Sequence, residues 1–132
     1  MTSFKRIEYT ALNSRQRENY NFAKVAARLA DYGFNCLRLT DDWNGADFIA
    51  VHIGGQNNNN ISVQLKGSMA IYRKYVGKGL HVAFIDGDDC YVYPHDELVA
   101  AFVERRGNAD WPDGPWPTVP RWATEFLQPY KI

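Results

Sequence analysis

Two runs rich in β-branched residues, 46–53 and 61–66, stand on either side of a short segment of glycine, glutamine and asparagine. Runs of this kind bounded by turn-forming residues indicate strands, and two in succession predict a hairpin. If the loop at 54–60, which ends in four asparagines, closes symmetrically, Asp47 falls roughly opposite Gly67. This register constrains the fold strongly, because a slip by one residue changes which side chains share a face.

One face of the second strand is polar. Side chains alternate between the two faces of a strand, so Ser62, Gln64 and Lys66 share one face and the apolar residues between them share the other. With Asp47 on the preceding strand, the hairpin carries a carboxylate, an amide and an amine on adjoining strands. We interpret this combination as a candidate metal-dependent phosphodiesterase centre.

The chemistry of such a centre assigns a task to each polar group. Phosphodiester hydrolysis needs a nucleophilic water, neutralisation of phosphate charge and help for the leaving oxygen. A hard divalent cation such as Mg²⁺ prefers carboxylate, carbonyl and water oxygens. Asp47 can supply the carboxylate, and the Gln64 side-chain oxygen or the Leu65 main-chain carbonyl can supply neutral ligands. Lys66 can orient water or stabilise developing charge, and Glu18 can complete the site directly or through water.

Glu18 belongs to a helical pattern that runs from about Asn13 to Tyr32, with Asn13 or Ser14 as the N-cap and Gly33 at the end. The apolar stripe of this helix is Phe22, Val25, Ala26 and Leu29. Glu18 precedes Phe22 by one turn and is expected on the buried face, where a carboxylate needs a partner or a cleft. The alternative is a first-turn glutamate that the helix dipole stabilises.

The remaining elements are expected in the following order. A strand at 34–40 precedes a polar turn at 41–45, and strands at 80–85 and 90–93 flank an acidic turn, before a helix from 94 to about 106 that Gly107 ends. The segment 69–79 is aromatic and basic, and its sequence is compatible with a short helix or an extended arm. In the segment from Asn108 onward, the three tryptophans and four prolines between positions 111 and 122 favour packing onto the domain or a partner over free disorder, with a proline-rich ligand as the less favoured alternative.

Composition limits the possible partners. The 132 residues suit one domain, and 15 basic residues balance 15 acidic ones, so no field of the whole molecule attracts nucleic acid. A local patch remains, because Lys66, Arg73, Lys74 and Lys78 lie close together in the sequence. The last three are candidate nucleic-acid-binding residues; a solvated charged turn is the alternative.

Cellular location is predicted from the cysteines and from hydropathy. Cys36 and Cys90 lie in apolar, strand-like runs, which favours reduced core thiols in a cytoplasmic protein over a disulfide framework. No apolar run approaches the roughly 20 residues that a membrane-spanning helix needs. We therefore expect no membrane partner.

The order helix with Glu18, strand with Gly45-Ala46-Asp47-Phe48, and strand with Gln64-Leu65-Lys66 resembles the PD-(D/E)xK nuclease superfamily over about residues 13–94. The resemblance implies an α/β (α+β) fold in which helices flank a central mixed sheet, as in restriction endonucleases. It implies a nuclease-like domain at 1–107, with 108–132 as a Trp/Pro-rich extension packed on it. It also makes Asp47 and Gln64 metal ligands, Lys66 catalytic and Glu18 an auxiliary carboxylate.

The activity implied by this resemblance is that of a Mg²⁺- or Mn²⁺-dependent endonuclease acting on DNA more than on RNA. A chain of this size has little room for a separate recognition domain, which favours a homodimer or selection by nucleic-acid structure over readout of a long sequence. Two positions depart from the family pattern. Ala46 replaces a proline that only shapes the entry to the strand. Gln64 replaces an acidic residue, which removes a negative charge from the metal site and weakens cation affinity unless Glu18 compensates. A catalytically degenerate nuclease fold that binds nucleic acid or protein is the alternative function.

Overall fold

The structure is a computed structural model that describes residues 3–55, 60–107 and 110–132. Its centre is a five-stranded sheet in the order β1-β2-β3-β5-β6. The strands are β1 (Phe34–Trp43), β2 (Ala46–His52), β3 (Ile61–Leu65), β5 (Leu80–Asp86) and β6 (Asp89–Pro94). Strands β3 and β5 pair in parallel and the other neighbours pair antiparallel, so the sheet is mixed.

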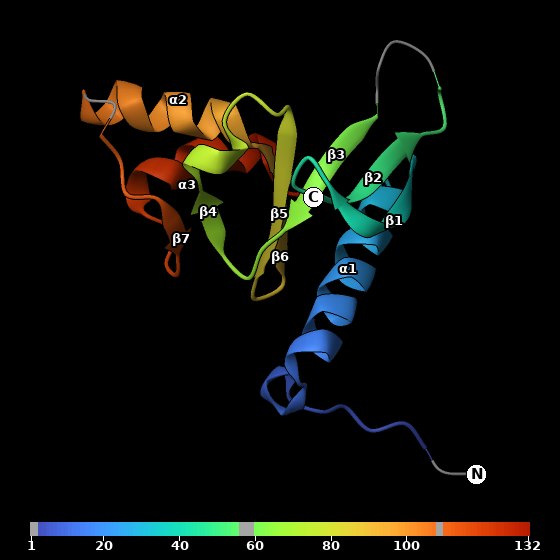
Figure 1. The fold of residues 1–132 in the computed structure, drawn as a ribbon. Coiled ribbons are helices and arrows are strands. Elements are labelled where there is room, and N and C mark those ends of the chain that lie inside the picture. The colour runs from blue at the N-terminus through green and yellow to red at the C-terminus, as the bar shows by residue number, and fades with distance from the viewer. Residues whose placement is uncertain (1–2, 56–59, 108–109) are drawn as a thin grey trace.

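Helices cover both faces of this sheet (Figure 1). Helix α1 (Ser14–Ala30) lies on one side, and α2 (His95–Arg106) and α3 (Arg121–Leu127) lie on the other. A second sheet pairs the short strands β4 (Met69–Ile71) and β7 (Gly114–Trp116). The predicted α+β class, with a mixed central sheet flanked by helices, is confirmed.

Residues on either side of α1 favour its start and its end. The side chain of Asn13 accepts a hydrogen bond from the Gln16 amide, and the side chain of Gln16 accepts one from the Asn13 amide. This reciprocal capping box satisfies two amides that the first helical turn leaves unpaired. Gly33 follows the helix with φ of 87°, a conformation that glycine adopts without a steric penalty.

The alternation of side chains along β5 and β6 divides the core into two layers. Ala83 and Val92 face α1 and pack with its Val25 and Leu29. Val82 and Tyr93 face the opposite way, toward α2 and α3. Strands β5 and β6, at one side of the sheet, thus bury side chains on both faces.

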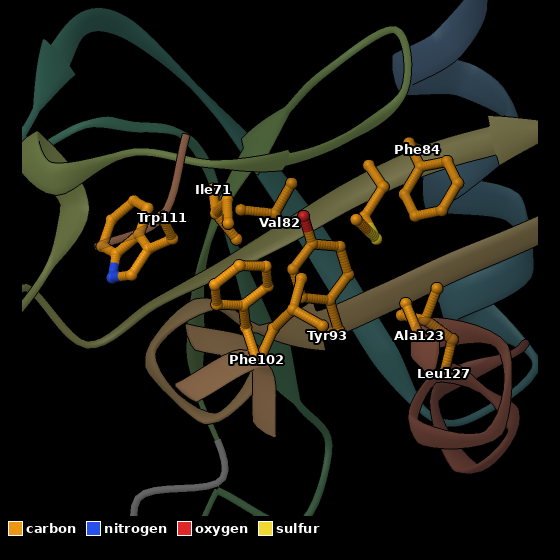
Figure 2. Close-up of a cluster of buried hydrophobic side chains, with 10 residues drawn as sticks. Ile71, Val82, Phe84, Tyr93, Phe102, Trp111, Ala123 and Leu127 are labelled. Atoms are coloured by element: carbon orange, nitrogen blue, oxygen red, sulfur yellow. The ribbon is translucent and has the colours of Figure 1, made fainter. Parts of the chain in front are cut away.

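The second layer brings together segments that are distant in sequence (Figure 2). Its labelled members are Ile71, Val82, Phe84, Tyr93, Phe102, Trp111, Ala123 and Leu127. Trp111 is 7% exposed, and Ala123 and Leu127 are buried with it. The Trp/Pro-rich segment therefore contributes Trp111, Ala123 and Leu127 to a core that β5, β6 and α2 also form.

Segment 69–79 is a buried strand followed by a turn of 3-10 helix, η2 (Arg73–Tyr75). Met69, Ala70 and Ile71 are fully buried, so this part of the segment is not an extended arm. Their strand, β4, pairs with β7 more than 40 residues later, with Met69 opposite Trp116.

The prediction of a polar turn at 41–45 is wrong for residues 41–43. Strand β1 continues to Trp43, which pairs with Ala46 in β2. The turn contains only Asn44 and Gly45, whose φ values are 51° and 87°. Positive φ at both central residues is the signature of a type I′ hairpin turn, for which Asn-Gly is the preferred sequence. A shift in register between Arg38 and Trp43 accommodates the acidic residues within the strand.

The register expected for the β2–β3 hairpin is also wrong. Ala50 pairs with Ile61 and Phe48 with Val63, which shifts the expected pairing by three residues. An odd shift exchanges the faces, so Asp47 lies on the same side of the sheet as Gln64, while Phe48 and Val63 share the buried side. Residues 56–59 of the loop, with most of its asparagines, lie outside the described residues.

Cys36 and Cys90 are free thiols. Cys36 is half-buried and Cys90 is buried, and burial raises the pKa of the Cys90 thiol to about 11. Within the described ranges, none of the helices combines the length and the hydropathy that crossing a bilayer requires.

Candidate functional site

All four residues predicted to be catalytic line one open cleft of about 660 Å³. Glu18 comes from α1, Asp47 from β2, and Gln64 and Lys66 from β3 and the residue after it. The remaining lining residues are Arg15, Arg38, Leu39, Thr40 and Leu65. The sheet thus brings together side chains that are up to 48 residues apart in the sequence, from Glu18 to Lys66.

The carboxylate of Asp47 is positioned by the end of β3. The backbone amide of Leu65 donates a hydrogen bond of 2.8 Å to Oδ2 of Asp47. A carboxylate accepts several hydrogen bonds or metal contacts through its two oxygens, so this single bond leaves it capacity for a further partner. Asp47 is half-buried, and its position follows from the observed register of the hairpin.

The electrostatics of Asp47 favour a positively charged or protic partner. Partial burial raises the pKa of this carboxyl above its ordinary value, and the nearby charges of Asp42 and Glu18 raise it further. The hydrogen bond from Leu65 and the charge of Lys66 lower the pKa, but they do not outweigh burial. Two neighbouring carboxylates therefore add negative charge at Asp47, which is an arrangement that a cation relieves.

Lys66 lies beside two tyrosines that we call the tyrosine cradle, Tyr72 and Tyr75. The Lys66 Nζ is 4.8 Å from the ring centroid of Tyr72 and 5.5 Å from that of Tyr75. The two rings meet edge to face with centroids 5.3 Å apart. Cation–π attraction restrains the ammonium group against these rings. Burial raises the pKa of Tyr75, and the charge of Asp47 contributes to the rise, so Asp47 acts electrostatically on the cradle that holds Lys66.

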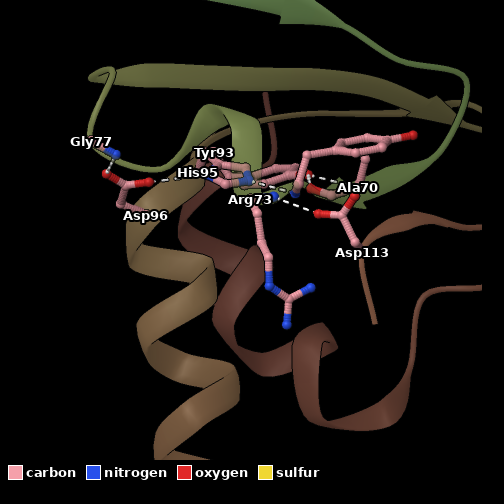
Figure 3. Close-up of polar contacts among 8 residues, drawn as sticks. Ala70, Arg73, Gly77, Tyr93, His95, Asp96 and Asp113 are labelled. Carbon is pink, nitrogen blue, oxygen red and sulfur yellow. Dashed lines mark hydrogen bonds and ion pairs between the residues drawn. The ribbon is translucent and has the colours of Figure 1, made fainter. Parts of the chain in front are cut away.

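A buried histidine anchors the cradle (Figure 3). The Nε2 atom of His95 accepts a hydrogen bond of 2.9 Å from the Tyr72 amide. Because Nε2 accepts, the ring proton is on Nδ1, which donates to Oδ1 of Asp96 at 3.0 Å. Oδ2 of Asp96 accepts from the Gly77 amide at 2.9 Å. His95 is fully buried and its ring also contacts Tyr75, so the start of α2 fixes segment 72–77 at both ends.

Gln64 uses part of its hydrogen-bonding capacity within the strand. Its Nε2 donates to the Leu65 carbonyl at 3.3 Å. This carbonyl is the neutral metal ligand proposed as an alternative to the Gln64 side-chain oxygen. Because this carbonyl already accepts a hydrogen bond from the Gln64 amide nitrogen, the side-chain oxygen of Gln64 is the better candidate ligand.

Glu18 is exposed and lies at the fifth position of α1. The first turn of the helix contains no acidic residue, so the alternative of a first-turn glutamate is wrong. The Glu18 side chain is exposed instead of buried, and it lines the cleft, which is one of the two situations that the sequence predicts for a carboxylate one turn before the apolar stripe.

Sequence reasoning missed two arginines that line the cleft. Arg15 precedes Glu18 by three residues, a spacing that puts both on one helical face and would have identified it. Arg38 lies in β1, opposite Phe48. Its guanidinium donates to Oδ1 of Asn19 at 2.7 Å and lies 5.1 Å from the Phe22 ring centroid. These contacts hold the Arg38 guanidinium between α1 and the sheet, and no local sequence motif predicts them.

The three basic residues predicted to bind nucleic acid have different surroundings in the structure. The Arg73 guanidinium lies 4.3 Å from the Trp111 ring centroid and 3.7 Å from Asp110, and the Arg73 amide donates to Asp113. Arg73 is therefore directed toward the C-terminal segment. Lys74 lies over both rings of the tyrosine cradle, at 5.1 and 5.2 Å, beside Lys66. Lys78 is exposed.

Comparisons with protein-family models, with curated proteins and with solved structures found no match to this chain. Among the described residues, no group of three or more histidine, cysteine, aspartate or glutamate side chains has the arrangement of a metal site. The oxygen groups predicted as ligands in the cleft are of a different kind, because they combine carboxylates with a side-chain amide and a main-chain carbonyl.

Proposed function

We propose that this protein is a metal-dependent nuclease that hydrolyses phosphodiester bonds of DNA, and that it belongs to the PD-(D/E)xK superfamily. The observation that carries the proposal is the convergence of Glu18, Asp47, Gln64 and Lys66 on one cleft. These residue types match the tasks of the reaction: oxygen ligands for a cation, and an ammonium group for phosphate charge.

The residues present suit a divalent cation. The pKa of Asp47 is raised by burial and by neighbouring carboxylates, so a cation at this carboxylate would remove an unfavourable concentration of negative charge. Asp47 and the Gln64 side-chain oxygen would hold Mg²⁺ or Mn²⁺, and Glu18 would contribute directly or through water. When bound, the metal supplies Lewis-acid activation of water and neutralises phosphate charge.

The other cleft residues bind and orient the substrate. Lys66, restrained by the tyrosine cradle, presents its ammonium group to a phosphate oxygen and stabilises charge that develops during cleavage. Arg15 and Arg38 line the same cleft and neutralise phosphates on either side of the reacting one. DNA binding then depends on the basic side chains of the cleft. The whole chain cannot supply the attraction, because its 15 basic residues are balanced by 15 acidic ones.

Cleavage assays test this function directly. We expect the purified protein to cut DNA in Mn²⁺ or Mg²⁺, and we expect EDTA to abolish cleavage because Lys66 and the arginines alone do not activate water. Linear duplexes, circular plasmid and single strands should be assayed side by side, and circular plasmid identifies endonucleolytic action. Cleavage that persists after both Asp47→Ala and Lys66→Ala would contradict the assignment.

The second candidate function is a degenerate nuclease fold that binds nucleic acid or a protein partner. The observation in its favour is the Gln64 amide, which replaces an acidic ligand and donates to the neighbouring Leu65 carbonyl. Such a protein would bind DNA without cutting it. A homodimer remains compatible with either function.

Gln64→Glu separates the two functions. The substitution adds a carboxylate beside Asp47, so we expect tighter Mn²⁺ binding than in the wild type by about tenfold, or about 1.4 kcal/mol. Without metal, the extra like charge should lower the melting temperature, and saturating Mn²⁺ should restore it. Calorimetric titration and thermal melts with and without EDTA measure both effects. Identical behaviour of wild type and Gln64→Glu at millimolar Mn²⁺ would favour the binding function.

A further inference from the structure

A second, smaller pocket adjoins the candidate catalytic cleft. Its volume is about 270 Å³, and it shares Lys66 with the cleft. The other residues that line it are Tyr9, Tyr20, Asn21, Gly67, Ile85 and Gly87. We call it the tyrosine pocket. A strand of nucleic acid whose phosphate contacts Lys66 would have its neighbouring nucleotide at this pocket.

Two tyrosines of this pocket keep much of their surface exposed. Tyr9 is 40% exposed and Tyr20 is 41% exposed. Their rings meet edge to face with centroids 5.3 Å apart, and the Tyr9 hydroxyl donates to Oδ1 of Asn21 at 3.2 Å. This contact joins the 3-10 turn at Tyr9–Ala11 to α1, so the two rings have a fixed relation to each other. Exposed and oriented aromatic rings offer faces on which another flat ring can stack.

Each tyrosine also carries its own cation. The Arg17 guanidinium lies 5.4 Å from the Tyr9 ring centroid, and the Lys24 ammonium lies 5.3 Å from that of Tyr20. With Lys66, the two rings are accompanied by three positive charges. Aromatic faces for bases, combined with cations for the phosphates between them, are the pattern by which proteins bind single-stranded nucleic acid.

We propose that the tyrosine pocket binds an unpaired nucleotide next to the point of cleavage, so that the substrate is a nucleic acid with a single-stranded segment. This inference rests on the proposed function for its reference to cleavage. In a duplex, the bases are stacked on their neighbours and their faces are closed to a protein ring, whereas an unpaired base is free to stack on tyrosine. The pocket is smaller than the roughly 300–1,000 Å³ typical of sites that enclose drug-sized ligands, which suits a single flat ring.

Fluorescence anisotropy with a labelled oligothymidylate and a blunt duplex of equal length, in EDTA, tests the pocket. We expect the wild type to bind the single strand more tightly than the duplex. Tyr9→Ala and Tyr20→Ala should each weaken single-strand binding by about 5- to 100-fold, the range that loss of one stacked base produces. Tyr20→Phe keeps the ring and should bind as the wild type does. Tyr32→Ala is the matched control, because Tyr32 is 54% exposed and lies outside the residues that line the pocket.

Photo-crosslinking gives a measurement that does not depend on the folding of a variant. An oligonucleotide with 5-iododeoxyuridine, irradiated with the wild-type protein, should form adducts on Tyr9 or Tyr20 that peptide mass spectrometry locates. Equal affinity for single strand and duplex, wild-type binding by both alanine variants, or adducts confined to other residues would each overturn the inference.

The failure of this inference is distinguishable from failure of the proposed function, because the binding assay contains no divalent cation. Tyrosine-dependent binding of single strands without any Mn²⁺-dependent cleavage would overturn the nuclease and leave the pocket in place. Cleavage of duplex DNA that Tyr20→Ala leaves unchanged, with no preference for single strands, would overturn the pocket alone.

Discussion

Asp47→Asn is expected to lower Mn²⁺-dependent cleavage by about 10³-fold or more, which corresponds to about 4 kcal/mol of transition-state stabilisation. The reason is chemical, because asparagine keeps the shape of the side chain but loses the negative charge that would hold the cation. Its side-chain oxygen can still accept the hydrogen bond that the Leu65 amide donates to Asp47. Single-turnover cleavage rates with saturating protein measure the effect, free of changes in DNA affinity.

The same substitution is expected to leave the fold at least as stable as the wild type at pH 7. The folded-state pKa of Asp47 is raised above its ordinary value of 3.8, chiefly by burial. A raised carboxyl pKa means that the contribution of this group to stability is present below the unfolded pKa and is lost as pH rises through the folded pKa. At neutral pH the ionised carboxylate therefore opposes folding, and asparagine removes that cost.

Urea unfolding at pH 7 and at a series of lower pH values measures this effect. The stability advantage of Asp47→Asn over the wild type should shrink as the pH falls below the raised pKa. Asp31→Asn is the matched control, because Asp31 is an exposed carboxylate at the C-cap of α1, outside the cleft. Full cleavage by Asp47→Asn, or a lower stability than wild type at pH 7, would contradict the role given to this carboxylate.

The sequence was sufficient for the parts of the site that depend on short-range order. Strand parity put Gln64 and Lys66 together, and helical spacing put Glu18 one turn before the apolar stripe. The side of the sheet on which Asp47 lies depends on the register of the β2–β3 hairpin, and the loop sequence does not determine that register. The observed odd shift places Asp47 with Gln64, and it follows from burying Phe48 and Val63 on one side of the sheet.

Asn44-Gly45 is a strong signal for a two-residue hairpin turn, and it marks the end of β1 correctly. Asp41 and Asp42, next to it, suggested a longer polar turn. They are consecutive exposed strand residues on opposite faces, and this end of β1 tolerates charge on both because water covers both.

The surroundings of Lys66 depend on contacts that no local pattern encodes. Segment 69–79 takes its structure from pairing between β4 and β7, which are distant in sequence. The tyrosine cradle then takes its position from His95, at the start of α2. Long-range pairing and a buried polar anchor both require the folded chain, so the sequence of this segment is compatible with both a short helix and an extended arm.

His95→Leu is therefore expected to lower the free energy of unfolding by about 1–3 kcal/mol, the cost of leaving a buried hydrogen-bonding group without a partner. Leucine replaces the ring by an apolar side chain, but the Tyr72 amide loses its acceptor and Asp96 loses its donor. Because His95 is fully buried, water does not reach its position to replace it. His95→Gln should recover part of the loss, because its side-chain oxygen can accept from the Tyr72 amide. Urea unfolding at pH 7 measures both variants.

His81→Leu is the matched control, because it makes the same substitution at another histidine, in strand β5. Burial lowers the pKa of His81, so the ring is neutral at pH 7, and its buried Nδ1 has no hydrogen-bond partner among the described residues. Removing an unpaired polar group should be close to neutral for stability. If the two leucine variants unfold at the same urea concentration, the hydrogen bonds of His95 do not hold segment 72–77.

The His95 variant also tests how Lys66 is positioned. Tyr72 and Tyr75 restrain the Lys66 ammonium group, and His95 fixes the backbone of one and contacts the ring of the other. At a temperature where both proteins are folded, cleavage by His95→Leu should fall by about tenfold or more, since a small misplacement of a catalytic group is costly. His95→Gln should recover activity in parallel with stability. Wild-type cleavage by a destabilised His95→Leu would show that the cradle does not position the lysine, and Lys66 would then act through its own flexible side chain.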